Sequence, residues 1–393
     1  MNATPRPKFT VHIERFEPVD RPAAAKPMAV VAVPVKDEVE RIGFCLESLC
    51  SQTGVEFAEV AVVLLLNNCT DGTAERVRTL APSLPFRLEL HQVELPDPYA
   101  NAGWARRLAM EAAAALADPA GLILTTDADT MVDSDWIEAN RREIAAGADA
   151  VAGYVMADPV ELMELDPCIL ERGALEWEYQ QLAAELEARA DPEPHDPWPR
   201  HNQNCGASAA VSAAAYRRIG GLPPKRVGED RALFHMLRRA DLKVRHSLEV
   251  QVVTSARTDG RALGGLSDAI RLRGDPEHPC DEALEEAVTT LRRALWRASA
   301  RQAWKAGRLG QEAEAWARRL RISLPEVRRA LERRSFGELW ADLEARSPRL
   351  ARRLVTGRLL KRELRRMRRL VDIARARARM EAAAPRPAVA AAR

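Results

Sequence analysis

The sequence predicts an α/β fold with a mostly parallel sheet, followed by an α-helical C-terminal region. Three observations lead to this prediction. Short apolar runs rich in β-branched residues alternate with helical stretches, the turns after these runs are polar, and the strand signals stop near residue 281. Alternation at this spacing is typical of βαβ units, which build parallel sheets. A chain of 393 residues is long enough for two or three domains, each with its own apolar core.

The predicted elements follow in chain order. The first 27 residues contain five prolines and little apolar periodicity, so we expect a flexible arm there. Short apolar runs predict strands over residues 28–35, 60–66, 88–93, 121–126, 206–212 and 250–254. Helices are predicted over residues 39–50, 101–116, 162–190 and 228–240, and over the stretches that end at Leu80 and Gly220. The predicted domains are the arm (1–27), an α/β domain (28–275), a basic α-helical region (276–380) and a disordered tail (381–393).

Composition excludes several classes of protein. The six cysteines form no CxxC pair, which argues against a structural zinc site or a disulfide scaffold and fits a reducing compartment. The chain contains neither an apolar signal-peptide region nor an apolar run of about 18 residues, so we predict a cytoplasmic protein without a membrane-spanning helix. Residues 281–393 carry 29 Lys+Arg and 14 Asp+Glu, whereas residues 1–280 carry 30 and 43. This asymmetry indicates two modules with different contacts.

Asp127-Ala128-Asp129 is the sharpest chemical feature. These two acids follow the strand predicted at 121–126, at the edge where open α/β sheets bind ligands. Carboxylate oxygens suit hard cations such as Mg²⁺ or Mn²⁺, and phosphate oxygens often complete the coordination shell. The alternative is that these acids precede a helix near Trp136 and only cap it. Position favours the first interpretation, because the polar clusters after strands 28–35 and 60–66 reach the same edge.

Five motifs taken together resemble family 2 glycosyltransferases. They are VPVKDE (33–38), NNCTDGT (67–73), TTDADT (125–130), CGASAAVSAAAYRRIGGLP (205–223) and GED (228–230). Their order and spacing are similar to that family over about residues 28–260. The resemblance implies the GT-A fold, a UDP- or GDP-linked sugar donor, a divalent cation (Mn²⁺ or Mg²⁺) and an acceptor hydroxyl. It does not indicate which acceptor is used.

The resemblance also implies roles for individual residues. Asp127 and Asp129 would bind the metal, and Asp230, next to Glu229, would be the general base. Direct deprotonation of the acceptor implies inversion at the anomeric carbon. Either Arg106 or Arg107 would approach the diphosphate. The donor-binding positions that the resemblance implies are Pro34, Val35, Glu38, Asn67, Asp71, Arg107, Asp127 and Ala128.

The sequence departs from the family pattern at two places. Leu66 stands where family members often carry an acid, and Thr254-Ser255 stand where they often carry a third metal ligand, a histidine. His246 lies several residues earlier. Arg257 and Arg261 are candidates for a bidentate phosphate clamp, with a solvated loop as the alternative.

Two other functions remain open at this stage. Asp127-Ala128-Asp129-Thr130 also matches the D-x-D-x-T nucleophile motif of haloacid-dehalogenase-like phosphatases. That family needs a second acidic pair after a strand, and GED (228–230) follows no predicted strand. A non-catalytic nucleotide-binding scaffold is the second alternative, which Leu66 and the missing histidine allow. The acids Asp129 and Asp230 argue against it.

The basic C-terminal region has two interpretations. Residues 341–380 contain 14 Lys+Arg and 4 Asp+Glu, with leucines at helical spacing. We favour a solvated helical extension that packs on the acidic domain. The alternative is peripheral contact with the anionic inner face of a membrane. Nucleic-acid binding is not expected, because the region has few aromatic residues outside core-like positions. The Pro-rich segment 191–200 is a candidate lid.

Overall fold

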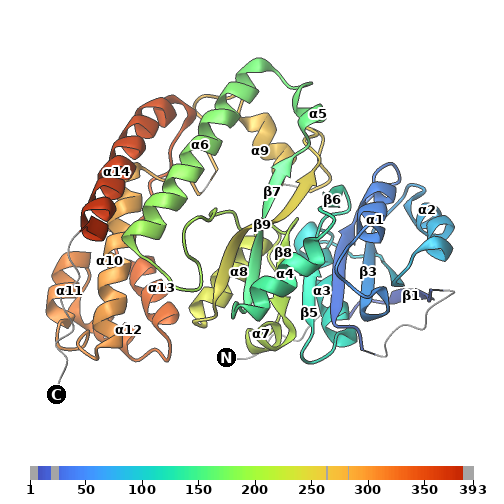
Figure 1. Cartoon of the computed structure of the whole chain (residues 1–393), viewed down its shortest axis with the longest axis horizontal. Coiled ribbons are helices and arrows are strands. Elements are labelled where there is room, and N and C mark those ends of the chain that lie inside the picture. Colours follow the sequence, from blue (N-terminus) through green and yellow to red (C-terminus); the bar gives the residue numbers. More distant parts are fainter. Residues whose placement is uncertain (1–7, 19–25, 263, 282, 384–393) are drawn as a thin grey trace. The chain divides into compact units, whose positions relative to one another are not determined.

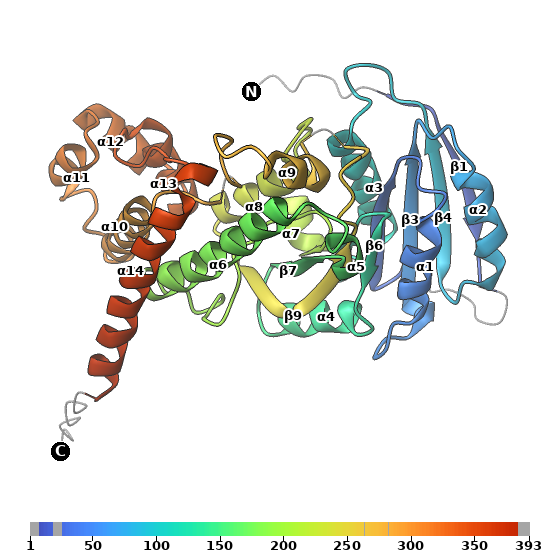
Figure 2. The same ribbon diagram turned by 90° about the horizontal axis from the view of Figure 1, so that it is seen from above.

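The computed structural model describes residues 8–18, 26–262, 264–281 and 283–383 (Figures 1 and 2). The chain divides into two compact units. Unit 1 comprises Met1–Leu170, Gln203–Gly274 and Glu332–Asp342, and unit 2 comprises Glu171–Asn202, Asp275–Leu331 and Leu343–Arg393. Both units combine stretches that are distant in sequence, whereas the sequence predicts boundaries that follow the chain.

Within the described residues, unit 1 is built on a nine-stranded sheet with the order β1-β4-β3-β2-β5-β8-β7-β9-β6. The neighbours β4, β3, β2 and β5 run parallel, as do β7 and β9, whereas β1, β6 and β8 pair antiparallel with their neighbours. The predicted α/β fold with a mostly parallel core is therefore confirmed. The strands are β1 (Val11–Phe16), β2 (Ala29–Val35), β3 (Val60–Asn67), β4 (Arg87–Val93), β5 (Leu122–Thr125), β6 (Thr130–Val132), β7 (Ala150–Ala157), β8 (Ala209–Ser212) and β9 (Val244–Thr254).

Helices on both faces explain why the central strands are continuous apolar runs. All of β3 is buried, and so is all of β2 except Pro34. Val31 and Val33 of β2 pack with α1, α2 and α4, whereas Val30 and Ala32 pack with α3, α7 and α8 on the opposite face. Figure 2 shows α1 and α3 on the two sides of the sheet. The helices of unit 1 are α1 (Ile42–Cys50), α2 (Thr73–Leu80), α3 (Ala102–Leu116), α4 (Trp136–Ala145), α5 (Pro159–Leu162), α7 (Ala213–Arg218), α8 (Glu229–Arg239) and α9 (Leu266–Leu272), with short 3-10 turns at Phe57–Glu59 and Ala81–Ser83.

The strand β1 corrects the prediction of a flexible arm for residues 11–16. It pairs antiparallel with β4 over six residues, and Arg15 forms an ion pair with Glu89 at 3.1 Å. The strand is an edge strand with mostly partly or fully exposed side chains, so it has no apolar run for sequence reasoning to detect. The parts of the predicted arm at 1–7 and 19–25 lie outside the described residues. The strands β6 and β7 were also not predicted, because β6 has three residues and β7 begins with the small residues of Ala-Val-Ala-Gly.

Strand pairing brings distant segments to one edge of the sheet. The carboxyl ends of β2, β3 and β5 meet there, as parallel register requires. Thr130 of β6 lies opposite Thr254 at the end of β9, and their hydroxyl groups bond at 2.8 Å across 124 positions of sequence. The residues that follow β9 therefore lie beside Asp129, which directly precedes β6.

Unit 2 is α-helical in the part that the structure describes, which confirms the prediction of a helical C-terminal region. The helix α14 continues to Ala383, beyond the predicted end at residue 380, and residues 384–393 of the predicted tail lie outside the described residues. No helix within the described ranges combines the length and the apolar character that crossing a membrane requires. The helices are α6 (Pro167–Ala190, in unit 2 from Glu171), α10 (Ala287–Lys305), α11 (Ala313–Leu320), α12 (Leu324–Leu331), the end of α13 (Phe336–Arg346) and α14 (Gly357–Ala383).

Ion pairs at intervals of seven residues join α6 and α14. Their distances are 2.7 Å, 2.7 Å and 2.6 Å, and the regular spacing shows that the two helices run parallel. Apolar side chains between these pairs form a common core, as in a coiled coil. Cations of the basic region therefore face acids of a segment inside the predicted acidic domain, as the packing interpretation expects. The pairs are Glu171–Lys361, Glu178–Arg368 and Glu185–Arg375.

Ion pairs connect the Pro-rich segment 191–200 to α10, which argues against the interpretation of this segment as a mobile lid. Arg297 lies 2.8 Å from Asp191 and 2.6 Å from Glu193, and Arg301 bonds the same two acids. The Asp191 side chain is only 4% exposed, so breaking these pairs would leave a buried charge without a partner.

We expect Glu185→Gln to destabilise the protein by about 1.5–3 kcal/mol at pH 7, the range for hydrogen bonds to charged groups. The hydrogen bond from Arg375 lowers the pKa of Glu185, whose side chain is 4% exposed. Because the folded-state pKa lies below the unfolded value near 4.5, this stabilisation is present above that pH and is lost as pH falls below it. Urea unfolding at pH 7 and pH 3 measures both effects. Glu171→Gln is the control, because both partners of that pair are exposed, and an equal loss in the control would contradict the prediction.

Candidate active site

Arg106 joins the two acidic motifs of unit 1. Its guanidinium group bonds Asp127 Oδ1 at 2.6 Å and Glu229 Oε1 at 3.1 Å, and also Thr125 Oγ1 and the Gly206 carbonyl oxygen, each at 3.0 Å. Burial acts to lower the pKa of Arg106, but the charges of Asp127 and Glu229 outweigh it and raise the pKa. Arg106 is therefore a permanent cation that fixes the first acid of the 127–129 motif against the start of α8.

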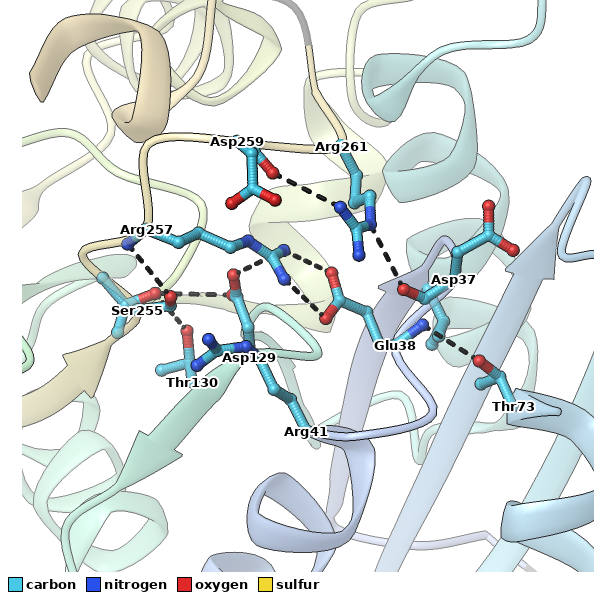
Figure 3. A network of polar contacts seen from close by, with 12 residues as sticks. Asp37, Glu38, Arg41, Thr73, Asp129, Thr130, Ser255, Arg257, Asp259 and Arg261 are labelled. Carbon is cyan, nitrogen blue, oxygen red and sulfur yellow. Dashed lines mark hydrogen bonds and ion pairs between the residues drawn. The ribbon is translucent and has the colours of Figure 1, made fainter. Parts of the chain in front are cut away.

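Asp129 lies in a second ion-pair cluster, which Figure 3 shows. Arg257 Nη2 is 2.9 Å from Asp129 Oδ2, and the same guanidinium group makes a bidentate contact with Glu38. Burial and then the charge of Asp127 raise the pKa of Asp129 to about 6, against the opposing effect of Arg257. Burial is the main cause of the raised pKa, and the neighbouring carboxylates of Asp127 and Glu38 add to it.

Asp230 lies at the first turn of α8, where the positive end of a helix favours acids. Its Oδ2 accepts a hydrogen bond from the Gly206 backbone N–H at 3.1 Å, and its Oδ1 accepts one from the Arg231 N–H at 2.7 Å. The preceding Gly228 has a φ of +70°, a left-handed conformation that glycine adopts without strain. Glu229 is buried and bonded to Arg106, so its carboxylate suits a positioning role, while Asp230 keeps its carboxylate partly open.

Cys205 lies next to these acids but is not suited to nucleophilic chemistry. Burial, followed by the charges of Asp230 and Asp127, raises the pKa of its thiol to about 12. The thiol therefore stays protonated near neutral pH, and a thiolate is what a cysteine nucleophile needs. The charges of Asp127 and Asp230 also raise the pKa of Arg106, so both acids lie in the same small region.

The loops after β2 and β3 form a cavity of about 140 Å³ beside the Arg257 cluster. Hydrogen bonds to two acids stabilise these loops. Asp71 accepts hydrogen bonds from the N–H groups of Val39 at 3.1 Å and Thr73 at 3.0 Å, and Asp37 accepts one from the Thr70 N–H at 2.7 Å. Carboxylates used in this way shape a loop more than they offer ligand contacts. The cavity is lined by Asp37, Glu38, Val39, Glu40, Arg41, Asp71, Arg257 and Arg261.

Several implied donor-binding residues do not offer a free side chain. Val35 is 1% exposed and belongs to the apolar core, and Ala128 is 4% exposed. Asn67 is buried at the end of β3, whereas Pro34 is partly exposed. Any contribution from Val35 or Ala128 to a ligand site therefore comes from their main-chain groups.

Arg107, one of the two arginines expected near a diphosphate, has its partners away from the acids that Arg106 binds. Its Nη1 donates to the Leu222 carbonyl oxygen, its Nη2 lies 2.8 Å from Glu111, and its guanidinium carbon lies 5.7 Å from the centre of the Trp104 ring. Neighbouring residues on a helix point about 100° apart, so only Arg106 of the pair faces the acids. Sequence alone does not tell which of the two does so.

The third metal ligand that the sequence leaves unassigned is not supplied by histidine. His246 lies within β9 and contacts Arg238 at 3.1 Å. Ser255 donates to Glu161 at 2.7 Å, and Thr254 Oγ1 lies 3.5 Å from Asp129 Oδ1. The sequence does not predict that Glu161 bonds the residues after β9, because Glu161 lies in the short helix α5, which has no recognisable motif. Across the described ranges, no group of three or more His, Cys, Asp or Glu side chains is arranged to hold a metal ion.

Asp127 and Asp129 nevertheless fit a divalent cation that takes few protein ligands. Arg106 pairs with Asp127 Oδ1 and Arg257 pairs with Asp129 Oδ2, so the second oxygen of each carboxylate lies outside these ion pairs, although Asp129 Oδ1 accepts a long hydrogen bond of 3.5 Å from Thr254 Oγ1. Mg²⁺ and similar ions are commonly held by one or two carboxylates together with substrate phosphates and waters. The donor set is therefore sufficient if a phosphate ligand is present.

The α/β fold and the acidic edge of the sheet agree with the resemblance drawn from the motifs. Residues 30–192 match the model of Glycosyl transferase family 2. The match covers less than half of the chain; it confirms the resemblance for that part and supports a glycosyltransferase. No curated protein matches the sequence.

This chain is also similar to solved structures. The mannosyltransferase PcManGT from Pyrobaculum calidifontis, in complex with GDP-Man and Mn²⁺, is 18% identical, with a TM-score of 0.44 over 95% of this chain and 81% of that one. S. aureus TarS 1–349 in complex with UDP-GlcNAc is 15% identical, with a TM-score of 0.44 over 89% of each chain.

Proposed function

We propose that the protein transfers a sugar from a UDP- or GDP-linked donor to an acceptor hydroxyl group, with Asp230 as the general base. The observation that carries the proposal is the Arg106 junction. It links Asp127, after β5, to the start of α8, where Asp230 lies, so that a leaving-group site and a base lie in one rigid assembly. Rigid placement of reacting groups is a major source of catalytic rate.

The donor is proposed to bind across the carboxyl ends of β2, β3 and β5. Its nucleoside would occupy the region of the 140 Å³ cavity, and its diphosphate would lie near Asp127 and Asp129. A divalent cation, Mn²⁺ or Mg²⁺, held by these two acids would neutralise the departing diphosphate when bound. Among the described residues, Arg261 bonds only main-chain oxygens of Asp37 and Asp259, each at 3.3 Å, so its guanidinium group is available to a phosphate group.

Asp230 is proposed to take the proton from the acceptor hydroxyl. The N–H groups of Gly206 and Arg231 each bond one carboxylate oxygen of Asp230, which fixes the orientation of the carboxylate. A base that activates the acceptor for direct displacement leads to inversion at the anomeric carbon. Glu229 is proposed to act through Arg106 by holding the assembly in place.

The phosphatase alternative fits the site less well. A phosphatase of that type needs a free carboxylate as its nucleophile, and Asp127 is held by Arg106 at 2.6 Å. The strand β5 lies at the centre of the sheet, flanked by β2 and the antiparallel β8, and the second acidic motif starts a helix. The family match over residues 30–192 favours the transferase over this alternative. A non-catalytic scaffold would bind a nucleotide without turning it over, so sugar transfer or donor hydrolysis that is lost in a folded Asp129→Ala variant would exclude it.

Peripheral contact of a cytoplasmic protein with the inner face of a membrane is proposed only for the end of α14. Ile373 and Met380 are 66% and 74% exposed there, among arginines such as Arg369 and Arg379, which have no ion-pair partner within the described ranges. Apolar side chains among cations suit an anionic lipid surface. Co-sedimentation with phosphatidylserine vesicles measures this contact, and equal binding to neutral vesicles would speak against it.

A thermal-shift experiment with UDP, GDP and their common sugar conjugates tests the donor proposal. A ligand at 100 times its Kd stabilises the folded state by about 2.7 kcal/mol, so we expect a raised Tm with one nucleotide class and a larger rise with Mn²⁺. Asp129→Ala should lose the Mn²⁺-dependent part. Asp135→Ala, at an exposed acid of the same region, is the control. No shift with any nucleotide in folded protein would contradict the transferase proposal.

A further inference from the structure

One guanidinium group, that of Arg257, covers two acids of the candidate site. Nη1 donates to Glu38 Oε2 at 2.9 Å, and Nη2 contacts both Glu38 Oε1 and Asp129 Oδ2, the latter at 2.9 Å (Figure 3). The side chains of Arg257 and Glu38 are 12% and 6% exposed, so the contacts are formed in a largely dry environment. The guanidinium group of Arg257 is therefore ion-paired with one carboxylate oxygen of Asp129, the acid proposed to bind the metal.

Arg257 differs from Arg106 in how many of its donors are used. Every guanidinium nitrogen of Arg106 has a protein partner, which anchors that side chain. Arg257 Nε is buried and has no hydrogen-bond partner within the described part of the chain. A buried donor without a partner costs free energy, and a phosphate oxygen would satisfy it.

The backbone before Arg257 is anchored, and its head group borders a cavity. Its own segment is anchored just before it, because Glu161 Oε2 accepts hydrogen bonds from the Ser255 hydroxyl at 2.7 Å and the Ala256 N–H at 2.6 Å. The head group borders the 140 Å³ cavity together with Arg261. A diphosphate entering there would offer several anionic oxygens to a fork of donors that matches phosphate geometry.

We propose that Arg257 is a resident cation that covers Asp129 until the diphosphate of the donor arrives, and that it couples donor binding to metal binding. The guanidinium group would turn to the phosphates, and Asp129 Oδ2 would then be available to hold a divalent cation. Arg257 is thus a positioning residue that acts through Asp129. The coupling is reciprocal, since two ligands that affect each other's affinity do so by the same factor. The nature of the donor rests on the proposed function.

Binding of Mn²⁺ alone to the full chain tests this inference without any nucleotide. Free Mn²⁺ is measured by electron paramagnetic resonance at pH 7.5 for the wild type and for Arg257→Gln. We expect the variant to bind Mn²⁺ at least tenfold more tightly, because the competing charge is removed and Asp129 keeps its carboxylate. Arg261→Gln is the matched control, because that arginine borders the same cavity but bonds only main-chain oxygens among the described residues. The Mn²⁺ affinity of this variant should stay within twofold of the wild type. Adding Asp129→Asn to Arg257→Gln should abolish the gain.

Equal Mn²⁺ affinity in the wild type and Arg257→Gln, or no binding by either, would overturn the inference. If Arg257→Gln fails to fold, Arg257→Lys keeps a charge but loses the fork, and it should bind Mn²⁺ more tightly than the wild type by a smaller factor; no change in this variant also overturns the inference. These measurements are independent of the donor. Nucleotide binding with unchanged Mn²⁺ affinities would overturn only the role of Arg257, whereas the absence of nucleotide binding would overturn the proposed function.

Discussion

Replacing Asp230 by Asn is expected to lower kcat by about 10²–10⁴-fold, the contribution typical of a general base. The amide oxygen of Asn can still accept the hydrogen bond from the Gly206 N–H, so the start of α8 should keep its structure. The variant cannot accept the acceptor proton at neutral pH. The measurement is the rate of sugar transfer, or of donor hydrolysis while the acceptor is unknown, with the donor that the thermal-shift experiment identifies.

The Asp230 prediction needs two controls. Donor affinity should stay within about threefold of the wild type, since Asp230 is not placed on the donor, and Tm should be little changed. Glu249→Gln, at an exposed acid of β9, should leave kcat unchanged. A kcat for Asp230→Asn within tenfold of the wild type would show that another group takes the proton.

Replacing Arg106 by Met should destabilise the protein by about 3–5 kcal/mol, the cost of breaking a buried ion pair by removing one partner. Arg106 is 6% exposed, and its loss leaves Glu229 buried without its cation. We also expect donor binding to weaken, because Asp127 loses the contact that orients it. Urea unfolding measures the stability, and the thermal-shift experiment measures the binding.

The neighbouring arginine supplies a matched control for this prediction. Arg107→Met on the same helix removes a hydrogen bond to the Leu222 carbonyl oxygen and a pair with the partly exposed Glu111, which should cost about 1 kcal/mol. The double variant Arg106→Met/Glu229→Gln should recover part of the lost stability, because the unpaired charge is then gone. Equal losses for Arg106→Met and Arg107→Met would contradict the proposed junction.

The sequence predicts secondary structure best where the local apolar pattern and burial agree. The central strands are buried on both faces, so their apolar runs are unmistakable, and polar residues directly after them place Asp127 and Asp129 at the ligand-binding edge. The sequence predicts the strands least well at the edges of the sheet. The edge strand β1 and the three-residue β6 depend on partners far away in the chain, so no local pattern predicts them.

The sequence by itself determined the class of fold and the order of the central elements, because these follow from periodicity along the chain, and its motifs carry the resemblance to family 2 glycosyltransferases that the family model matches over residues 30–192. Only the tertiary structure decided which charges meet. Arg106 faces Asp127 and Glu229 while Arg107 faces away, and Arg257 reaches Glu38 across 219 positions of sequence. The physical reason is that an ion pair depends on the direction and distance of two side chains in space, and helix phase and strand pairing, not sequence separation, set both.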